Sequence, residues 1–380
     1  MNILIAPNAF KNSLTADAAA EAIAAGFARS RLVCRCRCFP VGDGGDGTAA
    51  LLVRHLGGRT LPVPVSDPLG RPIEAKLGLI EDGRTAVIEL ADASGLRLLG
   101  PVELKPLRAT TYGTGELIRR ALDLNVKRIV LGVGGSATVD GGCGILQALG
   151  VRFLDAQRQE LTAAPRELAA LDSMDLSGLD ARLEECELVI LCDVDNPLLG
   201  EQGAAAVFGP QKGAGDTEVG ELDATLARWA AVVARQTGRD IARLPRGGAA
   251  GGVAAGLHGI LSARLANGIE YFLDAAGFDA ALEKASLVVT GEGSIDEQTL
   301  QGKAPYGVAL RARARQVPVV AVAGRVPLNM SEVLQESFDV LLAIGNGPEG
   351  LAEAMSHTAQ NLERTARQLA NLLAPTLARR

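Results

Sequence analysis

Short apolar segments that run directly into loops of glycine and acidic residues recur along the chain. The segments NILIAP, KRIVLGVGG, ELVILCDVDN and LVVTGEGS have the composition of strands buried inside a parallel sheet. A helical pattern follows the first of them from Ser13 to Arg29, with Ser13 or Thr15 available as the N-cap. This alternation predicts an α/β fold in which helices cover mainly parallel strands.

The middle of the chain breaks this alternation. From about residue 64 the segments LPVPVSDPLG, IEAKLGLI and TAVIEL are short, rich in β-branched residues and separated by turn residues. Such segments are typical of β-hairpins rather than of βαβ units. We therefore expect a second α/β domain inserted into the first, and a terminal amphipathic helix from residue 350 that is broken near Pro375.

Composition excludes several classes of protein. The chain has 380 residues, of which 48% are hydrophobic and 22% charged, and its formal net charge is -6, as in a globular protein with room for two cores. Aromatic residues make up only 3%, which argues against a surface that stacks nucleic-acid bases. No apolar run reaches the roughly 18 residues of a membrane span, and the first residues lack the pattern of a signal peptide. A cytoplasmic protein is the expectation.

Three of the six cysteines, Cys34, Cys36 and Cys38, alternate with arginines in the run CRCRC. In a strand this spacing places the three thiols on one side. Zinc sites usually combine C-x-x-C pairs or histidines, and the histidines lie far from these positions in the sequence. Reduced, structural cysteines are therefore the expectation.

One motif favours a dinucleotide site. Gly132, Gly134 and Ala137 satisfy the pattern G-x-G-x-x-A, and Asp155 follows at about the spacing of a ribose-binding acid. However, three further glycines at 141, 142 and 144 would fall inside the helix that must follow, at a cost of about 1 kcal/mol each. A helix that starts near Gly142 is more consistent with the sequence and leaves residues 136–141 as a polar loop.

Acidic glycine loops favour a different chemistry. GDGGDGT at 42–48, CDVDNPL at 192–198 and TGEGSIDEQT at 290–299 each follow an apolar strand and carry carboxylates among small residues. Carboxylates without histidine or thiolate suit Mg²⁺, and lysines at 11, 212 and 303 suit phosphate oxygens. Together they favour phosphoryl transfer. A P-loop NTPase is excluded because the only Gly-Lys pair is followed by Ala304, and the protein-kinase motifs are absent too.

Six motifs in a fixed order resemble the bacterial glycerate kinases of the glycerate 2-kinase type. They are IAPNAFKNSLTA, PVGDGGDGT, TTYGTGEL, GVGGSATVDGG, CDVDNPLLGEQGAAAVFGPQKG and TGEGSIDEQTLQGKAPYGVA. The resemblance runs the length of the chain. It implies ATP-dependent phosphorylation of D-glycerate to 2-phospho-D-glycerate with Mg²⁺.

The resemblance also implies an architecture. A Rossmann-like domain with a parallel sheet would comprise residues 1–63 and 285–380, and a second α/β domain of residues 64–284 would be inserted in it, with the active-site cleft between the two. The GVGGSATVDGG and CDVDNPL loops would then meet the GDGGDGT loop across that cleft.

Site residues follow from these motifs as expectations. Lys11 would stabilise the phosphoryl oxygens, and Asp193, with Asp43 behind it, would act as general base or Mg²⁺ ligand. Substrate or phosphate would be bound by Asn8, Gly44, Gly45, Gly134, Gly135, Ser136, Ala137, Thr138, Asp140 and Lys303. The metal ligands would be Asp46, Asp195, Glu292 and Asp296.

One position departs from the family pattern. Members usually read PDSFK where this chain reads Pro7-Asn8-Ala9-Phe10-Lys11. Asn8 can hydrogen-bond a substrate but cannot act as a general base, so either its role is limited to binding or activity has shifted.

Alternatives therefore remain beside the kinase: an NAD(P)-dependent hydroxy-acid dehydrogenase, a catalytically silent ligand-binding homologue, and a kinase that makes 3-phosphoglycerate. The expected partner is a small-molecule substrate rather than nucleic acid or a membrane, bound by a monomer or homodimer.

Overall fold

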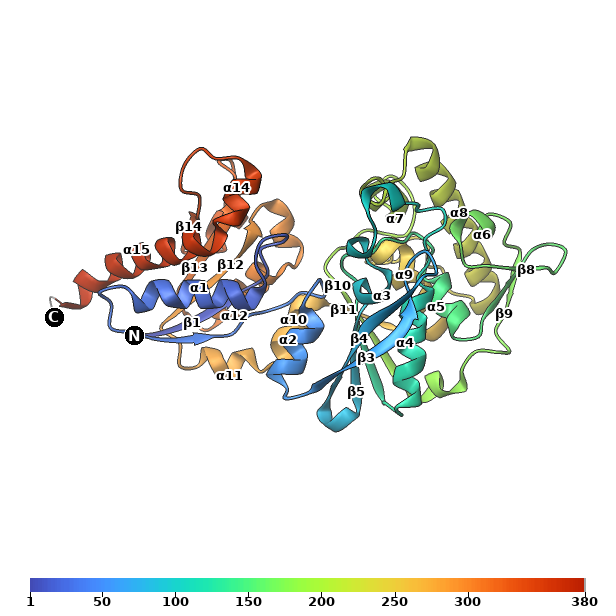
Figure 1. Ribbon diagram of the computed structural model, residues 1–380, viewed down its shortest axis with the longest axis horizontal. Helices are drawn as coiled ribbons and strands as arrows, with labels where there is room; N and C mark the ends of the chain where they lie inside the picture. Colours follow the sequence, from blue (N-terminus) through green and yellow to red (C-terminus); the bar gives the residue numbers. More distant parts are fainter. Residues whose placement is uncertain (379–380) are drawn as a thin grey trace. The chain divides into compact units, whose positions relative to one another are not determined.

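Parallel strands alternating with helices build both parts of the chain, as Figure 1 shows for the computed structural model. The structure describes residues 1–378, with side chains through residue 374. The chain divides into two units: unit 1 comprises Met1–Asp43 and Gly268–Arg380, and unit 2 comprises Gly44–Asn267. The α/β class predicted from the sequence is confirmed.

Unit 1 contains a five-stranded sheet in which all neighbouring strands are parallel, in the order β14-β13-β12-β1-β2. Its strands are β1 (Asn2–Pro7), β2 (Arg35–Cys38), β12 (Leu287–Ser294), β13 (Val319–Arg325) and β14 (Val340–Ala343). Its helices are α1 (Ala16–Ala28), α10 (Gly268–Ala275), α11 (Phe278–Leu282), η6 (Glu297–Gln301), α12 (Ala304–Ala314), α13 (Glu332–Glu336), α14 (Leu351–Ser356) and α15 (Thr358–Ala378).

Helices α1 and α15 lie side by side and share the core of unit 1 with β1, β12 and β13 (Figure 1). Thr15 caps α1 by accepting a hydrogen bond from the Ala18 N–H, as expected from the sequence. The two helices approach closely at Gly26, where a Cβ atom would lie 2.3 Å from the carbonyl oxygen of Glu363. The predicted break near Pro375 is wrong, because α15 continues to Ala378 and the interruption lies at His357, between α14 and α15.

Unit 2 contains a six-stranded mixed sheet in the order β11-β10-β6-β5-β4-β3. Its strands are β3 (Arg59–Ser66), β4 (Pro72–Ile80), β5 (Thr85–Glu89), β6 (Arg128–Gly132), β10 (Glu187–Cys192) and β11 (Arg264–Asn267). The first three form the predicted antiparallel hairpins, and β5, β6, β10 and β11 are parallel. A separate antiparallel sheet is formed by β7 (Arg152–Leu154), β8 (Glu160–Leu161) and β9 (Ser173–Asp175).

Helices and 3₁₀ turns complete unit 2, which has a hydrophobic core of its own. The helices are α2 (Thr48–His55), α3 (Ala91–Ser94), α4 (Tyr112–Asp123), α5 (Cys143–Ala148), α6 (Pro165–Leu168), α7 (Ala204–Phe208), α8 (Asp216–Thr237) and α9 (Ala249–Leu261). The turns are η1 (Glu81–Gly83), η2 (Leu96–Leu98), η3 (Pro101–Glu103), η4 (Ala181–Glu185) and η5 (Pro210–Lys212).

The boundaries between the two units lie at different residues from those expected. Residues 44–63 lie in unit 2, because α2 packs on the mixed sheet and β3 is one of its strands. Residues 268–284 lie in unit 1, where α10 contacts α12. Hydrophobic patterning does not mark such a boundary, because both units alternate strands and helices there.

Two smaller expectations also meet the structure. All six cysteines are free. Burial is the main cause that raises the pKa of Cys36 to about 12, and the neighbouring Cys34 adds to the shift.

In the described part of the chain, no helix has the length and apolar character needed to cross a membrane.

Candidate active site

Strands β1 and β12 are parallel neighbours in unit 1, and their carboxyl ends bring several predicted residues together. Asn8 follows β1, and its N–H donates to the carbonyl oxygen of Gly291 at 2.8 Å. The Nδ2 of Asn8 donates to Oδ2 of Asp43 at 2.8 Å. Asp43 is in reach because Val41, two residues earlier, donates its N–H to the carbonyl oxygen of Pro7 at 3.0 Å. Asn8, Asp43 and Glu292 therefore share one sheet edge.

Glu292 lies in β12 and is a buried carboxylate, 8% exposed. Burial raises its pKa to about 7; Lys303 opposes this shift and the like charge of Asp43 adds to it. The hydroxyl of Thr299 donates to Oε1 of Glu292 at 3.2 Å. Two carboxylates and one lysine are thus held close enough to influence one another.

Three more of the predicted site residues lie in unit 1, namely Asp296, Lys303 and Lys11. Asp296 caps η6, its Oδ1 accepting the Gln298 N–H at 3.0 Å. Lys303 is the half-buried N-cap residue of α12. Lys11 is exposed, and its backbone is in van der Waals range of Gly293, where a Cβ would lie 3.6 Å from the Lys11 nitrogen.

In unit 2 the loop that begins at Gly44 lies over the carboxyl ends of β6 and β10. The Gly134 N–H donates to the carbonyl oxygen of Gly44 at 3.1 Å. Side chains would not fit: a Cβ on Gly134 would lie 2.6 Å from the Cα of Gly45, and one on Gly44 would lie 2.9 Å from the carbonyl oxygen of Leu191. The glycines are therefore required by close backbone contact.

This contact corrects one expectation. Gly44, Gly45 and Asp46 were expected to meet the 134–140 loop across an interdomain cleft. They belong to the same unit as that loop, and a Cβ on Gly135 would lie 3.0 Å from Oδ1 of Asp46. The GDGGDGT motif is thus divided by the unit boundary after Asp43.

Charged residues around Asp46 include some that sequence reasoning missed. Arg97 pairs with Asp46 at 3.4 Å and with Asp92. Glu89 ends β5, and its Oε1 accepts the Ala49 N–H at 2.8 Å. Burial raises the pKa of Glu89 to about 7, and Asp92 adds to the shift. Glu89 could have been noticed in the sequence, because a carboxylate near the end of the buried segment TAVIEL is unusual.

The loop from Gly134 to Asp140 is held mainly by hydrogen bonds to other segments of unit 2. The Ala137 N–H donates to the carbonyl oxygen of Ser94 at 2.9 Å, so this amide is already engaged. Asp140 is buried and accepts hydrogen bonds from the N–H and hydroxyl of Thr111 and from the N–H groups of Gly142 and Gly144. We conclude that Asp140 shapes the loop from inside rather than facing a ligand.

Lys212 lies under this loop and is almost completely buried, at 2% exposure. Its ammonium donates to Oγ of Ser136 and to the carbonyl oxygen of Thr138, each at 2.7 Å. Burial lowers the pKa of Lys212 to about 7, against the opposing effect of Asp140. The sequence suggested that this lysine binds phosphate oxygens, but it did not predict the hydrogen bond to Ser136.

Asp193 and Asp195 follow β10. Asp193 is half-buried directly after the strand, beside Cys192, whose pKa burial raises to about 12, with Asp193 adding to the shift. Asp195 pairs with Arg246 at 3.1 Å. Since β6 and β10 are parallel neighbours, the predicted loops after them share one edge of the unit 2 sheet.

The dinucleotide alternative does not fit this geometry. Asp155 follows β7, which belongs to the separate antiparallel sheet, and its Oδ1 accepts N–H groups of Gln157 and Gln159 within its own turn. Helix α5 begins only at Cys143, after the N-cap Gly142, as the glycine count predicted. The strand, glycine turn and helix of a dinucleotide fingerprint are therefore not formed.

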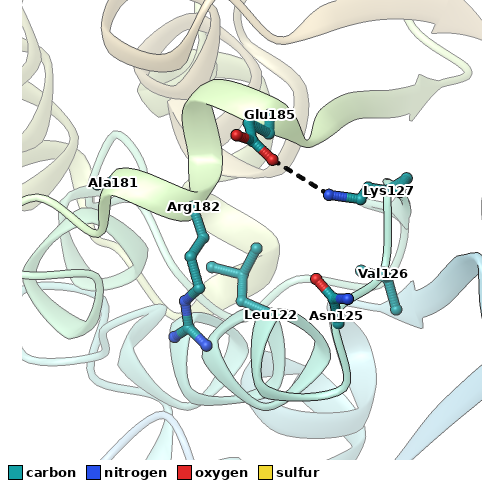
Figure 2. Close-up of a pocket in the computed structure, with 7 residues that line it drawn as sticks. All are labelled: Leu122, Asn125, Val126, Lys127, Ala181, Arg182 and Glu185. Carbon is teal, nitrogen blue, oxygen red and sulfur yellow. Dashed lines mark hydrogen bonds and ion pairs between the residues drawn. The ribbon is translucent and has the colours of Figure 1, made fainter.

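A shallow pocket of about 250 Å³ lies at the opposite edge of the unit 2 sheet, beside Lys127, which precedes β6. Figure 2 shows the ion pair between Lys127 and Glu185 at its rim. None of the predicted site residues lines it.

The sequence model of the glycerate kinase family matches residues 3–374. The chain belongs to the glycerate kinase family. It is 46% identical over 370 residues to a glycerate kinase of Bacillus subtilis (strain 168), with 97% of each chain covered. It is 40% identical over 374 residues to the glycerate 2-kinase of Escherichia coli (strain K12), with 98% of each covered.

A solved structure agrees with the family assignment. A crystal structure described as a glycerate kinase 2 from Salmonella typhimurium LT2 superposes with a TM-score of 0.85 at 42% identity, covering 100% of this chain and 99% of the other. The resemblance predicted from the motifs is confirmed. As a glycerate kinase family member, the chain is an enzyme of the kinase class, whose reaction consumes a nucleotide.

Proposed function

We propose that this chain transfers the γ-phosphoryl group of ATP to the 2-hydroxyl of D-glycerate, with Mg²⁺, and releases ADP and 2-phospho-D-glycerate. The observation that carries the proposal is the chain-long similarity to a relative named glycerate 2-kinase. We also propose a cytoplasmic enzyme that works as a monomer or homodimer.

The unit 1 cluster has the chemistry to bind nucleotide phosphates and a metal ion. Lys11 and Lys303 supply cationic groups for phosphoryl oxygens. Glu292, buried beside Asp43 so that the two carboxylates repel, fits a hard cation. Asp296 adds a carboxylate whose Oδ1 caps η6 and whose Oδ2 accepts the Ser294 hydroxyl at 3.4 Å. When bound, Mg²⁺ would neutralise charge on the transferred group. Asn8 would hold Asp43 by its hydrogen bond.

The unit 2 cluster has the chemistry to bind a small acid. Glycine loops of this kind allow backbone N–H groups to bind an anion, and Ser136 and Thr138 add hydroxyl groups. We propose Asp193 as the general base that takes the proton of the 2-hydroxyl. Asp46 and Asp195 already have arginine partners, so we place them second to Glu292 and Asp296 as metal ligands.

The test is a coupled assay for ADP release with purified protein, Mg-ATP and D-glycerate. L-glycerate, tartronate and a reaction without acid are the controls, and NMR of the product locates the phosphate. We expect D-glycerate-dependent ADP with phosphate on C2, and a loss of at least about a hundredfold in kcat for Asp193→Asn if this residue is the base.

Each other outcome changes a particular part of the proposal. Phosphate on C3 would retain the kinase and overturn the choice of hydroxyl. Binding of D-glycerate without turnover would overturn the proposal in favour of a silent homologue, the alternative that Asn8 alone suggests.

A further inference from the structure

We propose that Lys212 is a positioning residue for this reaction: its ammonium group fixes Ser136 so that the hydroxyl hydrogen of Ser136 points to the acid substrate. The inference rests on the proposed function and assigns Lys212 to the acid substrate, whereas the sequence associated this lysine only with phosphate oxygens. It concerns only unit 2.

Hydrogen-bond direction is the first argument. A protonated lysine carries three donors and no acceptor, so Oγ of Ser136 must accept the 2.7 Å bond from Lys212. The hydrogen of the serine hydroxyl therefore lies away from the lysine and is available to an anion. A neutral amine would be able to accept this hydrogen instead, which would remove the donor from the site.

Residues 140 and 141 at the end of this loop are held without Lys212. Asp140 is held by its four donors, and the indole N–H of Trp229 donates to the carbonyl oxygen of Gly141 at 3.2 Å. Gly141 also donates to the carbonyl oxygen of Gly251 at 3.0 Å. The ammonium acts on the preceding residues of the loop, where it holds Oγ of Ser136 and the carbonyl oxygen of Thr138.

Burial supplies the second argument. An ammonium group that is removed from water destabilises the folded protein unless its charge is compensated. Among the described residues, Asp140 is the charged group that acts on Lys212, and α7, which packs on the same turn, carries no titratable side chain. Because Asp140 is also surrounded by donors, an acid bound at Ser136 would compensate the ammonium further.

Thr138 supplies an independent observation. Its Oγ1 is buried and has no hydrogen-bond partner in the described structure, although the carbonyl oxygen of the same residue accepts from Lys212. Buried hydroxyl groups normally have partners. The loop that Lys212 supports thus contains a buried hydroxyl group without a protein partner.

The experiment compares Lys212→Met with Lys127→Met, an exposed lysine whose ion pair is shown in Figure 2. KM and kcat are measured for D-glycerate and for Mg-ATP. We expect K212M to raise KM for D-glycerate by about tenfold or more and to leave KM for ATP unchanged, because a hydrogen bond to a charged ligand is lost. K127M should retain both constants.

Two further readouts separate positioning from a merely structural role. In the wild type, kcat/KM for D-glycerate should fall as Lys212 loses its proton at rising pH, and K212M should lack this dependence. In a double-mutant cycle with Ser136→Ala, the two losses should not add. A folded K212M protein with wild-type KM and pH profile would overturn the inference; if K212M does not fold, a wild-type KM in S136A does so.

Thermal shifts with D-glycerate and inorganic phosphate distinguish failure of the proposed function from failure of the inference about Lys212. If the wild type binds either anion without turnover, the proposed function fails, and weaker binding by K212M still supports the role of Lys212. If the wild type turns over D-glycerate and K212M is unaffected, only the inference fails. Binding of neither anion to the wild type overturns both.

Discussion

Asn8 stands where the motif PDSFK, expected from the resemblance, has an aspartate, and the structure gives a physical reason why an amide is suited to this chain. Its Nδ2 donates to Asp43 at 2.8 Å, and its Oδ1 accepts the Ala9 N–H at 2.8 Å. A carboxylate in the same place would put two like charges beside Glu292, whose pKa is already raised. Asn8 thus reduces the electrostatic repulsion that the unit 1 cluster must tolerate without a metal ion.

Asn8→Asp is therefore expected to destabilise the metal-free protein by about 1–3 kcal/mol, because a hydrogen bond is replaced by repulsion. Mg²⁺ should restore more stability to N8D than to the wild type. The measurement is denaturant unfolding in EDTA and in Mg²⁺, with Asn8→Ala as the variant that removes the bond without adding charge. Equal stability of N8D and wild type in EDTA would contradict this account.

The raised pKa of Glu292 predicts how the stability of the protein depends on pH. Its pKa is raised from 4.5 to about 7 in the folded protein, so between these values the folded state holds more protons than the unfolded state. The contribution of this group to stability is then present at low pH and is lost as pH rises through that window. Glu292→Gln removes the titration.

We expect the free energy of unfolding of E292Q, relative to wild type, to rise by on the order of 2 kcal/mol between pH 5 and pH 8 in EDTA. Activity with Mg-ATP should fall, because a proposed metal ligand is lost. Glu297→Gln, which changes an exposed carboxylate in the same segment, is the matched control. A pH-independent difference in stability would show that Glu292 is not titrating as described.

At the scale of elements, the two glycine loops of unit 2 act as one structure. Their backbones touch at Gly44, Gly45 and Gly134 over the ends of β6 and β10. Sequence alone predicted both loops, since each follows an apolar strand, but not that they pack on each other. Their contact depends on how α2 joins the mixed sheet, which no local pattern encodes.

Gly134→Ala tests this contact. The added methyl group would lie 2.6 Å from the Cα of Gly45, so we expect a loss of about 1–3 kcal/mol of stability and lower kcat/KM for D-glycerate. Gly220→Ala is the control, because this helical position in α8 has no atom within 4 Å of the new group and should gain up to about 1 kcal/mol. Thermal unfolding and steady-state kinetics measure both. Unchanged kinetics in a folded G134A protein would count against a role of this contact in the site.

At the scale of the whole molecule, unit 2 is a continuous segment inserted into a discontinuous unit 1. Every strand of its two sheets comes from residues 44–267, and its hydrophobic core is made of the same residues. A segment that contains its own sheet and core should fold by itself.

We expect the fragment 44–267 to unfold cooperatively and to keep native-like circular dichroism, without turning over glycerate. Calorimetry and binding of a hydrophobic dye are the measurements. A fragment of residues 64–284, the bounds that the family resemblance implied, should be less stable, because it lacks α2 and the start of β3. A non-cooperative 44–267 fragment would show that unit 2 needs unit 1 to fold.

The sequence by itself determined the α/β class, the hairpins of β3 to β5, the start of α5 and the family, because these depend on local periodicity, turn residues and contiguous motifs. Only the tertiary structure decided the unit boundary at Asp43, the internal role of Asp140 and the burial of Lys212 under Ser136. These features join residues far apart in the chain, and burial and hydrogen-bond partners arise only when separate strands and loops pack together.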